Sequence, residues 1–84
     1  MKILSLRKDL LEYLTVQHLE KKWEKARLFF ERDIRHPSLE TELLEPRWRG
    51  FYSFRIDKKY RALFLIRDGE AEIFKITNHY KKWG

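Results

Sequence analysis

The sequence contains no cysteine, and it has no long run of hydrophobic residues. The absence of cysteine excludes a disulfide framework, a thiolate metal site and a cysteine nucleophile. A membrane-spanning helix needs about 20 apolar residues, and every apolar run in the sequence is much shorter. The opening segment 1–6 is too short for the core of a signal peptide. We therefore expect a soluble, unprocessed protein of the cytoplasm that does not associate with a membrane.

Repeats, linkers and low-complexity segments are also lacking, and the chain is short. Its 84 residues are enough for about one small domain, which excludes a multidomain enzyme. Hydrophobic residues make up 43% of the chain, enough for a packed core although 38% of the residues are charged. The composition predicts a single folded domain that spans residues 1–84.

The net charge of +6 is unevenly distributed. Residues 1–46 contain nine Lys/Arg and nine Asp/Glu, whereas residues 47–84 contain ten and four, so the whole excess lies in the second part. A field of one sign on part of a small domain attracts polyanions, which makes nucleic acid the leading partner class. The alternative is that these basic side chains only solvate the surface of strands.

The N-terminal part is predicted to form two helices. A short strand at residues 2–4 precedes a first helix over about residues 6–14, and Thr15 is the expected N-cap of a longer second helix because its hydroxyl can accept from an unpaired backbone N–H. The second helix carries one apolar stripe at helical spacing, which we expect to pack in the core: Leu19, Trp23, Ala26 and Phe30.

The C-terminal part is predicted to form strands. The sequence His36-Pro37-Ser38 ends the helical pattern, because proline disfavours helix in the residue before it. Candidate strands follow at residues 41–45, 51–56, 60–66 and 71–77, and Asp68-Gly69 favours a tight hairpin turn between the last two. The fold class is therefore α+β, with an N-terminal helical hairpin packed on a small, twisted, mainly antiparallel sheet.

Alternation along the strands separates an apolar face from a cationic one. The apolar face is expected to pack against the helices and comprises Tyr52, Phe54, Ile56, Ala62, Phe64, Ile66, Phe74 and Ile76. The opposite face carries Ser53, Arg55, Arg61, Lys75, Thr77 and, just past the last strand, His79, with Leu63, Leu65 and Ile73 between them. Arginines on neighbouring strands repel unless an anion or acidic group lies between them, so this face suits phosphate. Trp23 and Trp48 are interpreted as packing residues.

The segment 36–83 resembles the RelE/ParE superfamily of bacterial toxins, particularly the RelE-like and YoeB-like ribosome-dependent mRNA endonucleases. The resemblance depends on an ordered set of short motifs: GFYSFRI at 50–56, Tyr60-Arg61, Asp68-Gly69 and His79-Tyr80. It implies a toxin of a type II toxin–antitoxin system that enters the ribosomal A site and cuts mRNA there. The implied chemistry is attack of a ribose 2′-hydroxyl on the adjacent phosphate, without a metal or other cofactor.

The implied partners are mRNA in the A site, rRNA and a cognate antitoxin that lays an acidic, partly disordered segment across the basic face. Two alternatives remain open. One is a ParE-like inhibitor of DNA gyrase, since a shared fold does not fix function. The other is a noncatalytic RNA-binding relative, which is favoured if neither Glu40 nor Glu42 reaches the site.

The resemblance also implies roles for individual residues. Arg61 is expected to bind the scissile phosphate, and Arg55 to stabilise charge beside it. His79 is the expected general acid and Tyr80 the residue that stacks on or orients a base. The resemblance leaves the general base open. The carboxylate that YoeB-like toxins use lies upstream, in a segment whose loop is longer here, so Glu42 and Glu40 are candidates only from their neighbourhood.

Further residues of the basic part are candidates for binding RNA: Arg47, Arg49, Ser53, Lys58, Lys59, Lys75, Lys81, Lys82 and Trp83. A metal site is not expected, because the three scattered histidines have no paired-ligand spacing. His18 and His36 are interpreted as surface or hydrogen-bonded residues. Exposure of Arg61 on the open face predicts that reversal of its charge leaves stability nearly unchanged.

Overall fold

A computed structural model describes residues 1–78, so the candidates His79, Tyr80, Lys81, Lys82 and Trp83 lie outside the described residues. The described part has two α-helices, two short 3-10 helices and one antiparallel sheet in the order β1-β2-β3-β4. The elements are α1 (Lys8–Val16), α2 (Glu20–Arg32), η1 (Pro37–Leu39), β1 (Glu42–Leu43), η2 (Arg47–Arg49), β2 (Phe51–Arg55), β3 (Arg61–Arg67) and β4 (Glu70–Thr77). This arrangement confirms the predicted α+β class.

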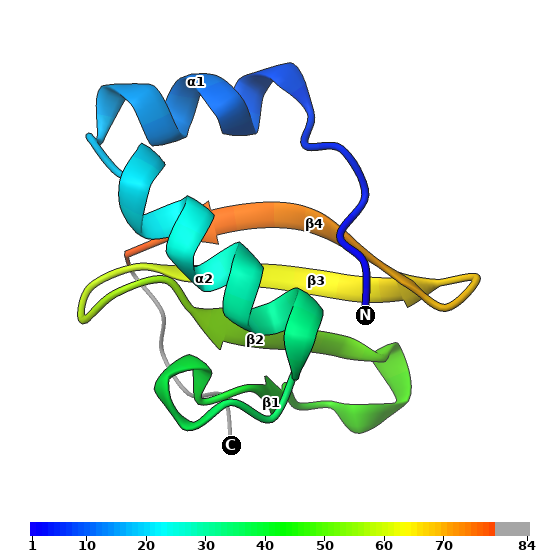
Figure 1. Ribbon diagram of the computed structural model, residues 1–84. Coiled ribbons are helices and arrows are strands. Elements are labelled where there is room, and N and C mark those ends of the chain that lie inside the picture. The colour runs from blue at the N-terminus through cyan, green and yellow to red at the C-terminus, as the bar shows by residue number, and fades with distance from the viewer. Residues whose placement is uncertain (79–84) are drawn as a thin grey trace.

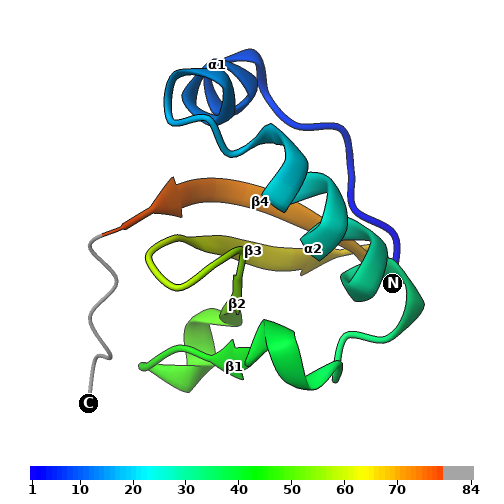
Figure 2. The same cartoon turned by 60° about the vertical axis from the view of Figure 1, so that its left-hand side comes forward.

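Both α-helices lie on the same side of the sheet (Figures 1 and 2). Helix α2 crosses the sheet, while α1 lies over the edge formed by β4 (Figure 1). None of the helices within residues 1–78 has the length and apolar character needed to cross a membrane. The predicted N-terminal strand is reduced to one parallel bridge between Ile3 and Ala71.

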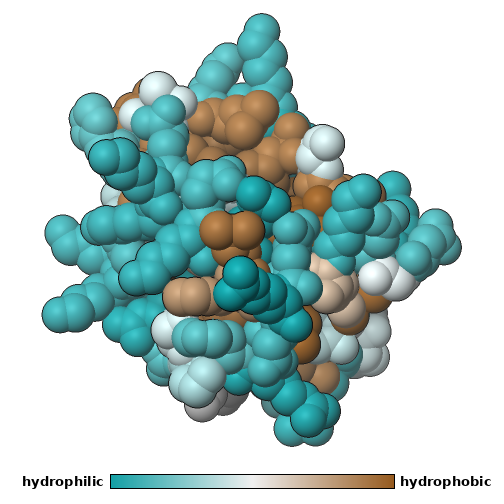
Figure 3. Space-filling model, in the orientation of Figure 1, coloured by the Kyte–Doolittle hydropathy of each residue, from teal (hydrophilic) through white to brown (hydrophobic). Residues whose placement is uncertain are grey.

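The core lies between α2 and the sheet. The predicted apolar stripe of α2 is buried, as expected for Leu19, Trp23, Ala26 and Phe30. Phe30 is fully buried, and its ring centroid lies 4.7 Å from that of Phe54 and 5.1 Å from that of Phe64. Aromatic burial of this kind fixes the position of α2 on the middle strands. The outer surface on the helical side is mainly hydrophilic, with smaller hydrophobic areas (Figure 3).

The predicted N-cap role of Thr15 is wrong. Thr15 lies in the last turn of α1, where its hydroxyl donates to the carbonyl of Leu11 at 3.2 Å. Helix α2 begins only at Glu20, after a turn in which His18 adopts a φ of 57°, and its N-cap residue makes no side-chain capping bond. Bonding to the carbonyl four residues earlier is the usual alternative for a threonine within a helix.

A β-bulge in β4 changes the predicted assignment of faces. Leu63 pairs with Lys75, but the next residue, Phe64, pairs with Ile73, so Phe74 is left as the extra residue. The parity of β4 therefore reverses at this point, as a bulge requires. Ile73 is buried in the core, whereas Phe74 is only partly buried. The predictions for these two residues are corrected accordingly.

Two turns fix the ends of β3. Asp68 and Gly69 have φ values of 51° and 79°, which confirms the predicted hairpin turn. In the connection from β2 to β3, the Asp57 carboxylate accepts hydrogen bonds from the backbone N–H groups of Lys59 and Tyr60, both at 2.8 Å. This Asx turn holds the connection in one conformation at the edge of the candidate site.

The prediction that Trp48 packs in the core is wrong. Trp48 is 82% exposed and lies in η2, with the Arg49 guanidinium 5.6 Å from its ring centroid. The turn is closed by hydrogen bonds from Arg49 N–H to the Pro46 carbonyl and from Gly50 N–H to the Arg47 carbonyl, both at 3.1 Å. Trp48 therefore sits in a tight turn outside the strands, whereas Trp23 packs in the core as predicted.

Candidate functional site

An open pocket of about 670 Å³ lies where β2 ends and β3 begins. The described residues that line it are Glu40, Arg55, Asp57, Lys58, Lys59, Arg61 and Asn78. Four of these side chains are cationic and two are carboxylates, so the lining has an excess of positive charge. Such a lining favours the binding of an anion.

The two arginines of the pocket face each other across neighbouring strands. Arg55 is the last residue of β2, Arg61 is the first residue of β3, and the two are direct partners in the antiparallel register. Like charges directly opposite each other destabilise a sheet unless they are compensated. The sequence pattern placed both arginines on one face of neighbouring strands, which the register confirms, and it indicated that an anion or an acidic partner should lie between them.

Arg61 is held firmly and is largely buried. Its Nε donates to the hydroxyl of Ser53 at 3.1 Å, and its Nη2 donates to the backbone carbonyl of Glu40 at 2.6 Å. The same Nη2 lies 3.9 Å from Oε1 of Glu42, and the side chain of Arg61 is only 12% exposed. The expectation of a freely exposed arginine is thus corrected, because several neighbouring groups surround its guanidinium.

Ser53 lies on the face of the sheet that carries Arg61, as predicted, but it is buried and not exposed there. It is fully buried, and it is the only buried polar residue among residues 1–78. In the sheet it lies between its partners Glu42 of β1 and Leu63 of β3. Its hydroxyl orients Arg61 and is not accessible to solvent. The prediction that Ser53 is exposed was therefore wrong.

Arg55 is more accessible than Arg61. Its Nε donates to the carbonyl of Asp57 at 3.1 Å, and its Nη1 donates to the carboxylate of Glu40. The side chain of Arg55 is 34% exposed. The pocket therefore presents one fixed, buried guanidinium and one that an incoming molecule can reach more easily.

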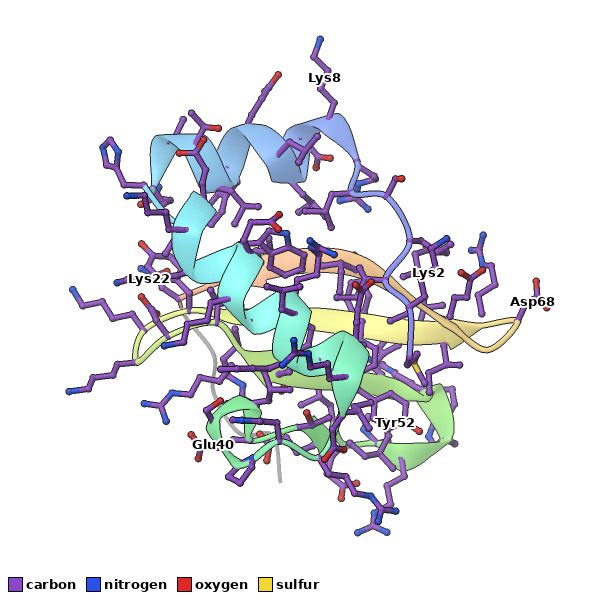
Figure 4. All side chains as sticks on the ribbon, viewed as in Figure 1. Lys2, Lys8, Lys22, Glu40, Tyr52 and Asp68 are labelled. Carbon is purple, nitrogen blue, oxygen red and sulfur yellow. The ribbon has the colours of Figure 1, made fainter. Side chains whose placement is uncertain are left out.

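Both candidate glutamates contact the arginine pair. Glu40 follows η1 with a left-handed φ of 44°, and it contacts Arg55 and Arg61 through its carboxylate and carbonyl oxygens respectively. Glu42 lies in β1 opposite Ser53, with its carboxylate near Arg61. Figure 4 shows Glu40 in the segment that leads from α2 into β1. Sequence reasoning had identified both glutamates only from their neighbourhood.

Sequence reasoning missed Asp57 and Lys22. The Nζ of Lys22 on α2 lies 3.0 Å from Oδ2 of Asp57, which ties the helix to the connection between β2 and β3 (Figure 4 labels Lys22). Burial acts to raise the pKa of Asp57, but hydrogen bonds from Lys22 and from the backbone N–H groups of Tyr60 and Lys59 outweigh it and lower that pKa. An aspartate before a short polar turn is the signal that could have indicated this role.

The other predicted RNA contacts among the described residues are divided between the pocket and other parts of the surface. Lys58 and Lys59 are exposed at its edge, whereas Arg47 and Arg49 are exposed in η2, which precedes the opposite end of β2. Lys75 is exposed on β4, opposite Leu63. Most of these predicted RNA contacts thus form one cluster at the pocket and a second one at η2, while Lys75 is on β4.

Chemically, the pocket combines two guanidinium groups with two carboxylates. Guanidinium groups bind phosphate and carboxylate oxygens through charge-assisted hydrogen bonds. A carboxylate next to a bound phosphate can take a proton from a nearby hydroxyl group. Arg55 and Arg61 can therefore bind an anion at the pocket, and Glu42, whose carboxylate lies 3.9 Å from Arg61, can accept a proton beside it.

Comparison with solved structures finds a similar fold in the YoeB dimer from Staphylococcus aureus, with a TM-score of 0.68 and 20% sequence identity, covering 94% of each chain. The described part of this chain thus has a RelE/YoeB-like fold, as the motifs at residues 36–83 had indicated. No model of a known protein family matches the sequence, and no curated protein sequence matches it either.

Proposed function

We propose that this chain is a toxin of a type II toxin–antitoxin system and acts as a ribosome-dependent mRNA endonuclease. The observation that carries the proposal is the pairing of Arg55 and Arg61 at one pocket of a RelE/YoeB-like fold, with the carboxylate of Glu42 3.9 Å from Nη2 of Arg61. The sequence resemblance assigns catalytic roles to both arginines, and Glu42 is a candidate for the general base from its neighbourhood. The reach of both glutamates to the arginine pair argues against a noncatalytic RNA-binding relative.

In the proposed reaction, Arg61 and Arg55 bind the scissile phosphate and stabilise the charge that develops on it. Glu42 takes the proton of the ribose 2′-hydroxyl, the oxygen attacks the adjacent phosphorus, and the bond from phosphorus to the 5′-oxygen breaks. His79 gives a proton to the leaving 5′-oxygen, and Tyr80 orients a neighbouring base. The products are a 2′,3′-cyclic phosphate and a 5′-hydroxyl, and the scheme needs no metal because guanidinium groups supply the positive charge.

The remaining cations are proposed to place the protein on RNA in the ribosomal A site. Lys58 and Lys59 lie next to the pocket and are suited to contact the phosphates beside the cleaved bond. The other proposed contacts to mRNA or rRNA are Arg47, Arg49, Lys75, Lys81, Lys82 and Trp83. Action on translating ribosomes would place the protein in the cytoplasm.

The proposed protein partner is a cognate antitoxin. An acidic segment that folds on the cationic pocket would compete with RNA for Arg55 and Arg61. The net charge of +6 favours rapid encounter with such a partner. Binding of this kind would neutralise the toxin without any change in its fold.

The test is to map the ends of an mRNA by primer extension on programmed ribosomes. The parent protein should produce cuts with cyclic phosphate ends, and Glu42→Gln should slow cleavage by about 100-fold, the usual scale for a lost general base. Glu24→Gln, which changes an exposed carboxylate on α2, is the matched control and should cleave at the parent rate. Inhibition of DNA gyrase without RNA cleavage would establish the ParE-like alternative, and ribosome binding without cleavage the noncatalytic one.

A further inference from the structure

A single residue, Glu40, contacts both arginines of the pocket. Its carboxylate accepts a hydrogen bond from Nη1 of Arg55, and its backbone carbonyl accepts one from Nη2 of Arg61 at 2.6 Å. The arginines lie directly opposite each other in β2 and β3, where their charges repel without an intervening anion. The chain itself therefore supplies a negative charge at the place where a phosphate would bind.

The main chain and the side chain of Glu40 are constrained to different extents. The main chain adopts a left-handed φ of 44°, and its N–H donates to the carbonyl of Pro37 at 3.3 Å. Together with the bond from Arg61 to the carbonyl, these contacts fix the backbone. The side chain is 55% exposed, so its carboxylate can turn into solvent while the carbonyl stays on Arg61.

We propose that the Glu40 carboxylate is an internal substitute for the substrate phosphate, which occupies Arg55 in the free protein and is displaced when an RNA phosphate binds. The inference rests on the proposed function in taking an RNA phosphate as the group that binds. Carboxylate and phosphate oxygens accept the same charge-assisted hydrogen bonds from a guanidinium group, so one can replace the other.

The exchange has two consequences for the site. Arg55 stays oriented before substrate arrives, because Glu40 and the Asp57 carbonyl both hold its guanidinium. An anion must also compete with an intramolecular carboxylate, so small, freely diffusing anions bind weakly. An RNA makes further contacts with the protein, and these place one of its phosphates at the pocket, where it overcomes the competition. Glu40 thereby makes the site selective for RNA over small free anions.

The experiment measures binding of inorganic pyrophosphate by titration calorimetry at constant ionic strength. Glu40→Gln removes the charge of the carboxylate but keeps its size, and it should bind pyrophosphate about 10-fold more tightly than the parent, a change of about 1.4 kcal/mol. The matched control is Glu24→Gln, which removes one charge from a side chain of similar exposure (57% against 55%) that pairs with Arg27 on α2. The control should change the affinity by less than about twofold, because it lies outside the described lining of the pocket.

Equal or weaker binding by Glu40→Gln would overturn the inference, since it would mean that Glu40 positions Arg55 and does not compete with the ligand. An equal gain in Glu24→Gln would overturn it as well, by showing a general effect of net charge. Glu40→Asp provides a second test that keeps the charge. The shorter side chain withdraws the carboxylate from Arg55, so this variant should also bind more tightly than the parent.

Binding of pyrophosphate does not depend on RNA cleavage, so the two proposals can fail separately. If the parent cuts no RNA but Glu40→Gln still binds pyrophosphate more tightly, the displacement is correct and the proposed enzyme activity is wrong. If the parent cuts RNA and Glu40→Gln shows no gain, only the displacement is wrong.

Discussion

The Nε of Arg61 donates a hydrogen bond to the fully buried hydroxyl of Ser53 at 3.1 Å. Ser53 lies in the middle of β2 and Arg61 begins β3, so the sheet register itself brings the two side chains together. The guanidinium group that is proposed to bind phosphate is thus oriented from inside the protein. These contacts orient the guanidinium group in the free protein, before any ligand binds.

Removal of the Ser53 hydroxyl should therefore affect both stability and activity. Ser53→Ala leaves a largely buried N–H of Arg61 without this acceptor, which costs about 1 to 3 kcal/mol in free energy of unfolding. Cleavage should slow at the same time, because Arg61 is no longer held in one orientation. Urea unfolding and single-turnover cleavage measure the two effects, and Ser5→Ala, at an exposed position, is the control that should change neither.

The two arginines of the pocket should differ in what their charge reversal costs. The side chain of Arg61 is 12% exposed and that of Arg55 is 34% exposed. Arg61→Glu places a third carboxylate beside Glu40 and Glu42, so it should destabilise the fold by about 2 kcal/mol or more. This revises the expectation from the sequence that the change is neutral.

Arg55→Glu is the comparison, and it should reduce stability less because solvent reaches that position. Thermal or urea unfolding of the two variants under the same conditions decides the matter. Equal losses of stability would contradict the difference in burial on which the prediction depends. Neither variant should cleave RNA, since each loses a cation that is proposed to bind the phosphate.

Local patterns predicted most of the fold. The boundaries of β2, β3 and β4, to within about one residue, and the Asp68-Gly69 hairpin follow from alternation and turn chemistry, which depend only on neighbours in the sequence. The bulge at Phe74 was not predictable in this way, because it arises from the pairing of two strands. Thr15 failed as a cap for a related reason, since the hydroxyl finds a closer acceptor within α1.

The candidate site was predictable in part. Strand alternation placed Arg55 and Arg61 on one face and indicated that an anionic group should lie between them. That the group is Glu40 depends on a contact between residues 40 and 61 and on a left-handed backbone conformation, and no local pattern specifies either. The burial of Ser53 likewise follows from the packing of neighbouring strands around it.

The ion pair between Lys22 and Asp57 predicts a pH dependence of stability. The pKa of Asp57 is lower in the folded protein than its ordinary value of 3.8, so its contribution to stability is fully present above that value. The contribution is lost as the pH falls through the lowered pKa. Asp57→Asn should therefore make stability less sensitive to acid below about pH 4 than the parent.

Urea unfolding between about pH 2 and pH 7 tests this directly, because the slope of stability against pH reports the protons taken up on unfolding. Lys22→Gln is the partner control. It keeps the Asx turn made by the backbone N–H groups of Lys59 and Tyr60, so its pH dependence should lie between those of the parent and Asp57→Asn. Identical slopes for all three proteins would show that the pair does not stabilise the fold.

The η2 turn offers a test of RNA binding away from the pocket. Arg47 and Arg49 are both exposed there and flank Trp48, which is 82% exposed. Changing both arginines to glutamine should weaken binding to single-stranded RNA and lower the slope of log affinity against log salt by about 1.4, since each phosphate contact contributes about 0.7. The fluorescence of Trp48 should change when RNA binds to the parent, and Trp48→Phe identifies its share of the signal. An unchanged salt slope in the double variant would mean that Arg47 and Arg49 do not contact the phosphates of the RNA.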